Sequence, residues 1–265
     1  GVASNLETAI AGTNGGVFVI NSGGGYTFND NGDFEALAVG QSTTTQVTYT
    51  VTDSEGGTDT ATLTITVTGT NDGPTAVADT GATTEDSILN VAADGVLNNE
   101  TDPDTTDTLT VTQITNAAGN GSGTGNGLFT VNPDGSYSFN PNGEFDYLAA
   151  GETETSTIDY TISDGNGGTS TASITVTITG TNDAPVAVDD AQTFDEDTVA
   201  TGNVLSNDSD VDDGAVLTVT EFIVDGTTYA VAENTPGTAD MPGVGVLEIG
   251  SDGSYTFTPA PDYVG

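Results

Sequence analysis

A repeat with a period of 111 residues runs through this chain. The segment G-T-N-D-G-P at 69–74 returns as G-T-N-D-A-P at 180–185, and G-Y-T-F-N at 25–29 returns as S-Y-S-F-N at 136–140. No gap is needed to align this half of the unit. Self-similarity at a fixed period indicates an array of like units that stack on one another. The fold must therefore be one that about 110 residues can build and then repeat.

A third copy of the unit follows the second. Its D-E-D-T and D-V-D segments, at 195–198 and 210–212, match T-E-D-S at 84–87 and D-P-D at 102–104. We expect three parts. Residues 1–70 are the C-terminal part of a first repeat, residues 71–181 are one complete repeat, and residues 182–265 are the N-terminal part of a third. A sequence that begins and ends inside repeats is expected of an excerpt from a longer array.

The unit at 71–181 reads as a series of short β-strands. Seven runs are candidates, at 75–78, 87–91, 108–114, 127–132, 136–140, 155–163 and 169–179. In the last run Ala172, Ile174, Val176 and Ile178 alternate with Thr and Ser, as in a strand with one buried face. Seven such strands in about 110 residues predict an all-β fold of tandem immunoglobulin- or cadherin-like β-sandwiches. The expected core residues are Phe129, Tyr137, Phe139, Phe145, Leu148, Ile158, Tyr160 and Ile162.

The residue types that are missing exclude most catalytic chemistry. The chain has 40 Asp and Glu, no Lys, Arg, His or Cys, and a formal charge of −40. It therefore lacks the usual general bases, the Schiff-base amine and the thiolate nucleophile. Nothing can neutralise phosphate, so we expect no nucleic acid partner. No apolar run approaches the roughly 20 residues that a membrane helix needs, so we expect no direct membrane insertion.

Acidic side chains are concentrated in the loops. Seven antiparallel strands place loops alternately at two ends of a sandwich. The predicted upper end carries Asp72, Asp102, Asp104, Asp107, Asp134 and Asp164, and the lower end carries Glu85, Asp86, Glu152, Glu154 and the exit segment with Asn182 and Asp183. When repeats stack, the lower end of one meets the upper end of the next, so carboxylates should converge at the junctions.

Clustered carboxylates without a protein cation repel one another unless a bound ion offsets the repulsion. Loops rich in Asp, Asn and backbone carbonyls suit Ca²⁺, which takes six to eight oxygen ligands. The D-x-D spacing lets two side chains of one loop reach the same ion. We therefore expect Ca²⁺ sites at the junctions. The expected ligands are Asn71, Asp72, Glu85, Asp86, Asp102, Asp104, Asp107, Asp164, Asn182, Asp183, Glu196, Asp197, Asp208, Asp210 and Asp212.

Two long stretches resemble known repeat families. The run from D-G-S-Y-S-F-N-P at 134–141 to G-T-N-D-A-P at 180–185 is similar to a VCBS-type repeat. The stretch N-D-A-P-V-A-V-D-D to G-N-V-L-S-N-D-S-D-V-D-D at 182–213 resembles the bacterial cadherin-like repeats that alternate with it. The resemblance covers essentially the whole chain. It implies calcium-stiffened extender modules of very large secreted or surface adhesins of the RTX type, which act in adhesion and biofilm formation.

The cadherin resemblance extends to individual ligands. Asn71-Asp72 and Asn182-Asp183, each followed by a proline, resemble the cadherin linker. The pairs Asp102/Asp104 and Asp210/Asp212 resemble its D-x-D loop, and Glu85 and Glu196 its early acidic ligand. The linker here is shorter and lacks the leading Asp, so the resemblance implies one or two ions per junction.

An assembly protein and an enzyme are the two alternative functions. In an assembly protein the same repeats would pack laterally or exchange strands between identical chains, because the first part lacks early strands and the third lacks late ones. An enzyme is disfavoured, although D-T-G at 79–81 spells the aspartic-protease triplet. Such an enzyme needs two carboxylates that share a proton, and the third repeat reads D-A-Q at the aligned positions. The expected partners are thus neighbouring repeats of the same chain, with identical chains as the alternative.

Overall fold

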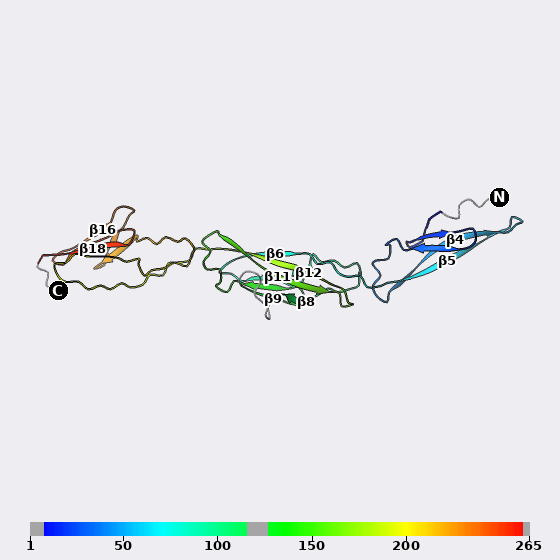
Figure 1. Ribbon diagram of the computed structural model, residues 1–265, viewed down its shortest axis with the longest axis horizontal. Helices are drawn as coiled ribbons and strands as arrows, with labels where there is room; N and C mark the ends of the chain where they lie inside the picture. The colour runs from blue at the N-terminus through cyan, green and yellow to red at the C-terminus, as the bar shows by residue number, and fades with distance from the viewer. Residues whose placement is uncertain (1–7, 116–126, 262–265) are drawn as a thin grey trace. The chain divides into compact units, whose positions relative to one another are not determined.

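The computed structural model describes residues 8–115 and 127–261, and its regular secondary structure is almost entirely β-strand (Figure 1). One short 3₁₀ helix, η1 (Gly95–Leu97), is the exception within these ranges. The predicted all-β fold class is therefore confirmed.

The complete repeat forms a sandwich of two sheets. The larger sheet has the order β6-β12-β11-β8, with β6 (Asp79–Thr84), β12 (Thr169–Thr179), β11 (Thr153–Ser163) and β8 (Thr110–Thr115). The smaller sheet has the order β7-β10-β9, with β7 (Leu89–Val91), β10 (Tyr137–Asn140) and β9 (Leu128–Val131).

Alternation along the strands creates the core between these sheets. In β12 the side chains of Ile174, Val176 and Ile178 are fully buried, while the threonines between them are partly exposed. The rings of Phe129 and Phe139 pack with centroids 4.8 Å apart, a distance typical of favourable aromatic pairs. All eight core residues predicted from the sequence are buried, namely Phe129, Tyr137, Phe139, Phe145, Leu148, Ile158, Tyr160 and Ile162.

One predicted strand was wrong. Residues 75–78 make only an isolated bridge, Thr75 to Thr101, and the edge strand is β6 at Asp79–Thr84. The apolar run T-A-V-A looks more like a strand than D-T-G-A-T-T does, but packing decides the matter. Gly81 lies so close to Leu89 and to the Tyr137 hydroxyl that a Cβ would be 2.6 and 3.0 Å from them. The glycine lets the edge strand approach the second sheet closely.

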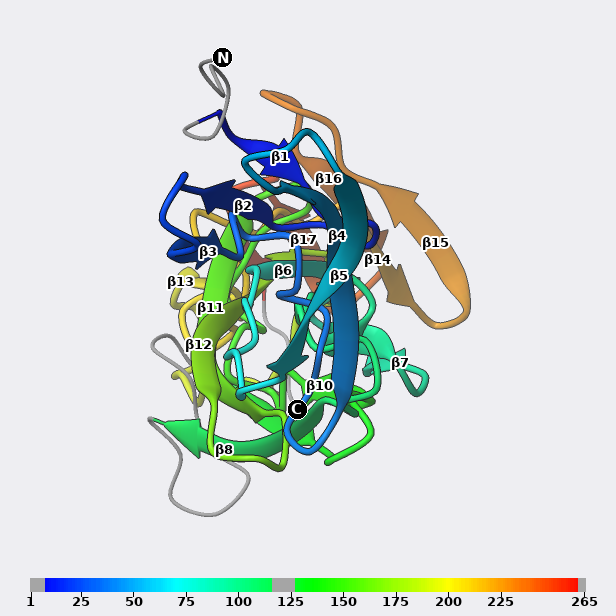
Figure 2. The same ribbon diagram turned by 90° about the vertical axis from the view of Figure 1, so that its right-hand side faces the viewer.

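The first repeat reproduces the last four strands of the complete one with the same bounds after the shift of 111 residues. β2 (Val17–Ile20) and β3 (Tyr26–Asn29) correspond to β9 and β10, and β4 (Ser42–Thr52) and β5 (Thr58–Thr68) correspond to β11 and β12. β4 and β5 form a long antiparallel pair by themselves (Figure 2), and β1 (Ile10–Ala11) adds to β2.

The third repeat shares with the complete repeat the pairing of its first described strand with the S-Y-T-F strand, but its sheets differ. A four-stranded sheet has the order β13-β18-β17-β16, and a hairpin is formed by β14 and β15. The strands are β13 (Ala200–Asn203), β14 (Glu221–Val224), β15 (Thr227–Ala230), β16 (Gly237–Met241), β17 (Gly245–Ile249) and β18 (Ser254–Pro259).

The described residues group into two compact units. One contains the residues up to Thr83 together with 88–140 and 155–177, and the other contains 84–87, 141–154 and the residues from Ile178 on. This grouping does not test the three-part division predicted from the repeat, which stays a prediction.

Candidate metal centres

The first acidic cluster lies where the segment after β5 meets two loops of the complete repeat. We call Asn71, Asp72, Asp102, Asp104, Asp107 and Asp164 the first cluster. Carboxylate oxygens of Asp102, Asp104 and Asp107 lie within 4.8 Å of one another. Three carboxylates at this separation would repel strongly without a cation, because Coulomb energies rise as the surroundings become drier.

Hydrogen bonds fix the positions of these side chains. The backbone N–H of Asp72 donates to Oδ2 of Asp104 at 2.9 Å, and the N–H of Asp104 donates to Oδ1 of Asp102 at 2.9 Å. The Asn71 amide donates to Oδ2 of Asp164 at 2.9 Å. The Asn166 amide donates to Asp107 at 2.8 Å. The linker and two loops are therefore joined through acidic side chains.

Asp164 and Asp102 have opposite electrostatic surroundings. Burial raises the pKa of Asp164, but hydrogen bonds from Asn71 and from the backbone of residues 166–168 outweigh it, so its pKa lies below the usual range. Burial raises the pKa of Asp102, and the nearby carboxylates of Asp104, Asp107 and Asp164 raise it further. A cation beside Asp102 would favour the charged form of its carboxyl group.

The second acidic cluster combines two acidic residues of the turn between β6 and β7 with the linker and the D-x-D loop that follow the complete repeat. We call Glu85, Asp86, Asn182, Asp183, Asp210 and Asp212 the second cluster. Glu85 accepts the Thr181 backbone N–H at 2.6 Å, and Asp86 accepts the Thr181 hydroxyl at 2.8 Å. Oδ2 of Asp212 accepts the Asp183 backbone N–H at 3.1 Å. The N–H of Asp212 in turn donates to Asp210 at 3.0 Å.

The pKa of Asp183 is raised above its usual range, and its causes show which carboxylates lie near the second cluster. Burial raises this pKa first, and the carboxylates of Asp86, Asp212, Asp146 and Asp210 raise it further. Asp146 was missed by the sequence prediction. The signal for it is the repeated N-G-E-F-D at 142–146, which aligns with N-G-D-F-E at 31–35 and keeps an acid at this position.

Five side-chain oxygens in the two clusters are buried and accept no hydrogen bond from the described residues. They are Asn71 Oδ1, Asp102 Oδ2 and Asp104 Oδ1 in the first cluster, and Glu85 Oε2 and Asp212 Oδ1 in the second. Buried polar atoms without a partner are rare and costly, so each requires an explanation. All five are hard oxygen donors, which suit a cation such as Ca²⁺.

Three predicted ligands have other surroundings. Glu196 and Asp197 are exposed in a turn, whereas their counterpart Glu85 is buried under Thr181. Oδ1 of Asp208 accepts the Val188 backbone N–H at 2.8 Å, although Asp208 also lines a hollow of about 340 Å³ with Asp183 and Asp210. Asp134, placed at the upper end by the sequence, instead accepts hydrogen bonds from Ser136 in its own turn.

Sequence reasoning also missed a third acidic site. The Tyr160 hydroxyl lies 2.8 Å from Oδ2 of Asp79 and 2.5 Å from Oε1 of Glu100, and also contacts the carbonyl oxygen of Val77 at 3.0 Å. Burial raises the pKa of both carboxyl groups above the usual range. A phenol has one proton to donate, and the raised pKa of both carboxyl groups favours a protonated carboxyl group that donates to the phenol oxygen.

The fold and the sites together define a class of protein, namely a tandem array of β-sandwich repeats with acidic clusters beside the segments that join them. Family comparison then gives the identity. The model for the bacterial cadherin-like domain matches residues 71–180 and 182–265, and the model for the bacterial Ig domain matches residues 2–66. The chain belongs to the bacterial cadherin-like domain family, as the sequence resemblance predicted.

Individual relatives share part of the chain. The calcium-binding lectin RapA2 of Rhizobium johnstonii is 34% identical over 139 residues, which are 51% of this chain and 58% of that protein. Among solved structures, protocadherin gammaB7 EC3-6 gives a TM-score of 0.46 at 14% identity, covering 94% of this chain and 57% of that one. Protocadherin gamma B2 domains 3–6 give 0.45 at 14% identity, covering 96% and 59%. The chain thus spans less than two thirds of each of these proteins.

Within residues 8–115 and 127–261, no helix has the length and the apolar character that crossing a membrane would require.

Proposed function

We propose that this chain is a calcium-bound extender segment of a large secreted or cell-surface bacterial adhesin, with repeats at 1–70, 71–181 and 182–265. The family assignment and the partial match to a calcium-binding lectin support an extracellular adhesion role. The finer assignments, which are VCBS-type repeats, an RTX-type adhesin and a role in biofilm, rest on the sequence resemblance alone. A non-catalytic role agrees with the absence of His, Lys, Arg and Cys from the sequence.

The observation that carries the calcium assignment is the set of five buried oxygens without hydrogen-bond partners. An isolated buried carboxylate is strongly unfavourable, so it must be paired, protonated or bound to a metal. The sequence contains no Lys, Arg or His with which to pair it. A divalent cation satisfies the unpaired oxygens and cancels the repulsion among neighbouring carboxylates at the same time.

The proposed ligands divide between the clusters. Asn71, Asp102 and Asp104 supply the buried oxygens of the first cluster, and Asp107 and Asp164 stand beside them. In the second cluster, Glu85 and Asp212 supply buried oxygens, and Asp86, Asp183 and Asp210 add charge. Asn182 lies next to Asp183 and donates its amide to the Asp183 carbonyl. Asp72, Glu196, Asp197 and Asp208 complete the set of proposed ligands.

The proposed role follows from where the ligands lie along the chain. In each cluster, the N–H of a linker residue donates to the second Asp of a D-x-D loop, Asp72 to Asp104 and Asp183 to Asp212. An ion bound to that same carboxylate would hold the linker and the loop together. An extender needs joints that resist bending, and shared ions supply that resistance without a large apolar interface.

Thermal unfolding in calcium and in chelator at matched ionic strength tests this proposal. A ligand that binds only the folded state at about 100 times its Kd adds about 2.7 kcal/mol of stability per site. We expect the Tm to rise in millimolar calcium, a concentration suited to extracellular modules. Magnesium at the same concentration is the control, because it keeps its water ligands and should give a smaller rise. Equal Tm values in calcium, magnesium and chelator would contradict the proposal.

A further inference from the structure

One loop of the complete repeat holds the start of the linker at residues 181–185. This loop, residues 141–152, joins β10 to β11, and we call it the brace loop. The Gly180 N–H donates to the Glu152 carbonyl oxygen at 2.8 Å. The two backbones come so close that a Cβ on Gly180 would overlap the carbonyl oxygens of residues 148–149. A side chain does not fit at this position, and the chain enters the linker from a fixed place.

The brace loop also reaches the segment that follows the linker. The backbone N–H of Asp213, which comes directly after the D-x-D loop, donates to the Tyr147 carbonyl oxygen at 2.8 Å. Donor and acceptor are both backbone groups, so this bond needs no cation. The brace loop is therefore bonded to the chain before the linker and again after it. Neither bond uses a side chain that we propose as a calcium ligand.

The brace loop is itself anchored in the complete repeat. The side chains of Phe145 and Leu148 are buried in the core. Between them, the Tyr147 hydroxyl donates to the carboxylate of Glu154 in β11. That bond, together with burial and the negative charges of Glu154 and Asp213, raises the pKa of Tyr147 to about 12, so the hydroxyl keeps its proton at neutral pH. The carbonyl group that accepts from Asp213 thus belongs to a residue that is fixed on both sides and through its own side chain.

The first repeat contacts its own linker in a related way with different residues. Gly69, the counterpart of Gly180, donates its N–H to the Gln41 carbonyl oxygen at 3.0 Å, as Gly180 does to Glu152. The Gln41 side-chain amide then donates to the Thr106 hydroxyl oxygen, beyond the linker, at 3.4 Å. A loop bonded on both sides of a linker therefore occurs twice, with a backbone bond across the linker in one case and a side-chain bond in the other.

Tyr147 and Glu154 change together between the repeats. The aligned residues of the first repeat are Ala36 and Thr43, so both partners of the hydroxyl–carboxylate pair are replaced there. The pair is present where the bond across the linker is made by Tyr147, and it is absent where that bond is made by Gln41. This agrees with a role of the pair in holding the Tyr147 carbonyl group in place.

We propose that the brace loop limits bending of the linker at 181–185 without metal, and that Tyr147 is the positioning residue for the bond to Asp213. The inference rests on the proposed role as an extender, because that role requires stiff joints, but the contact itself does not depend on calcium. The brace loop and a bound ion act on the same linker through separate bonds. In chelator the brace loop restricts the linker, and calcium restricts it further.

Amide hydrogen exchange in chelator tests the contact directly. Asp213 is exposed, and so is Thr105, the residue at the aligned position after the first D-x-D loop. The Thr105 N–H has no acceptor among the described residues, so it is the matched control. A backbone hydrogen bond of ordinary net strength shifts an equilibrium about 2- to 10-fold, and we expect protection of this size at Asp213 only. Equal protection of the two amides would overturn the proposal.

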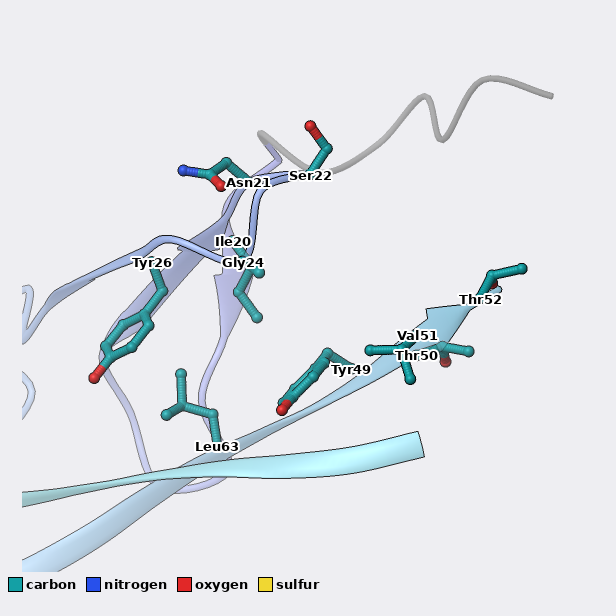
Figure 3. Close-up of a pocket in the computed structure, with 10 residues that line it drawn as sticks. All are labelled: Ile20, Asn21, Ser22, Gly24, Tyr26, Tyr49, Thr50, Val51, Thr52 and Leu63. Carbon is teal, nitrogen blue, oxygen red and sulfur yellow. The ribbon is translucent and has the colours of Figure 1, made fainter. Parts of the chain in front are cut away.

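Two tyrosine variants test the positioning role. Tyr147→Phe removes the hydroxyl bond to β11 and should lower the protection of the Asp213 amide towards that of a free amide. Tyr49→Phe is the control, because Tyr49 lies towards the far end of β4 and β5 from their linker. Figure 3 shows its ring directed into the same space as the side chains of Tyr26 and Leu63. Wild-type protection of Asp213 in Tyr147→Phe would overturn the role of Tyr147.

Pulsed electron resonance in chelator tests whether the contact restricts the linker. Asp213→Pro removes the N–H that donates to Tyr147, and Asp213→Ala keeps this N–H while removing the same charge. With spin labels at Ser87→Cys and Ser206→Cys, we expect a broader distribution of distances in Asp213→Pro than in Asp213→Ala. Calcium titration of both variants should give the same binding, which shows that the D-x-D loop is intact.

The outcomes separate this inference from the calcium assignment. Equal distributions for Asp213→Pro and Asp213→Ala in chelator would overturn the brace loop, whatever calcium does to the wild type. A broader distribution in Asp213→Pro, with no effect of calcium on either variant, would contradict the calcium assignment and leave the brace loop supported.

Discussion

The backbone N–H of Asp72 donates to the Asp104 carboxylate at 2.9 Å, so a linker residue is attached to a loop that lies 32 residues further along the chain. The same bond recurs between Asp183 and Asp212 at 3.1 Å. In both cases the other oxygen of the accepting carboxylate is buried without a partner. One oxygen thus fixes the linker, and the second is left for a ligand.

This arrangement predicts that the two clusters bind metal separately. Asp104→Asn and Asp212→Asn each remove one charge at one cluster. We expect isothermal titration to show that each variant loses part of the calcium bound by the wild type, and that the double variant loses more than either. Asp134→Asn is the control, because among the described residues this carboxylate accepts side-chain and backbone hydrogen bonds from Ser136 in its own turn. Loss of all bound calcium in one single variant would show that the clusters are not separate sites.

The contacts of the Tyr160 hydroxyl predict that its removal lowers folding stability more than removal of the hydroxyl of Tyr49, the equivalent tyrosine of the first repeat. Tyr160→Phe removes contacts with Asp79 and Glu100 and leaves buried polar groups unsatisfied, which costs about 1–3 kcal/mol of folding stability. Tyr49→Phe at the equivalent place in the first repeat should change stability little, because Tyr49 is exposed and its hydroxyl has no partner among the described residues. Urea unfolding of both variants in chelator measures the difference. Similar losses from both would contradict the assignment.

The raised pKa values of Asp79 and Glu100 predict how stability changes with pH. Their pKa values are higher in the folded state than in the unfolded chain, mainly because burial disfavours the charged form. Between the unfolded and folded values, the folded state holds the extra proton. Stability contributed by these groups is therefore gained as the pH falls through that interval and lost as it rises again.

Asp79→Asn tests this loss of stability with rising pH, because the variant should flatten the pH dependence of the free energy of unfolding above the ordinary carboxyl pKa of about 4. Asp59→Asn, on an exposed residue, controls for the change in net charge. The measurement is made in chelator. A slope that Asp79→Asn leaves the same as in the control variant would show that the Tyr160 network does not titrate in this range.

The sequence predicted the sandwich and its core because the alternation in strands such as β12 is strong and the repeat confirms it internally. It placed the first strand at 75–78, and Asp79–Thr84 is the observed position. The physical reason is that the position of this edge strand depends on how closely its backbone can approach the second sheet, here at Gly81, and not on its apolar character.

The candidate sites were predicted by residue type and spacing, and this prediction is incomplete at individual residues. The D-x-D loops and the N-D linkers come together because the repeat fixes both in one register. Glu85 is buried because Thr181, 96 residues further along the chain, donates its backbone N–H to it, and such a distant partner cannot be read from the E-D motif itself. Asp146 was missed because its partners are distant in sequence.

Exposure of equivalent aromatic residues predicts the order of cleavage by chymotrypsin. Tyr26 and Tyr49 should be cut before Tyr137 and Tyr160, because the first pair is exposed and the second pair is buried. Calcium should slow cleavage at the buried pair by stabilising the fold that protects it. Mass spectrometry of early fragments gives the order. Early cleavage at Tyr160 in calcium would show that the core of the complete repeat opens easily.

The last prediction concerns the stiffness of the joints, where the proposed function is exerted. In the second cluster, Thr181 and Asp183 of the linker are bonded to Glu85 and Asp212 on either side of it. Without an ion, repulsion among Asp86, Asp146, Asp210 and Asp212 opposes these bonds. With calcium, the same carboxylates attract a shared ion and hold the linker in one conformation.

We therefore expect the distribution of distances across the linker to narrow when calcium is added at fixed ionic strength. Spin labels at Ser87→Cys and Ser206→Cys, measured by pulsed electron resonance, would report this distribution around the second cluster. Asp212→Asn should keep a broad distribution in calcium, and labels at Ser138→Cys and Thr157→Cys, inside the complete repeat, should give a narrow one in both conditions. A distribution across the linker that is equally broad with and without calcium would limit the ion to stabilising single repeats, and the extender would then need rigidity from direct packing or from association between chains.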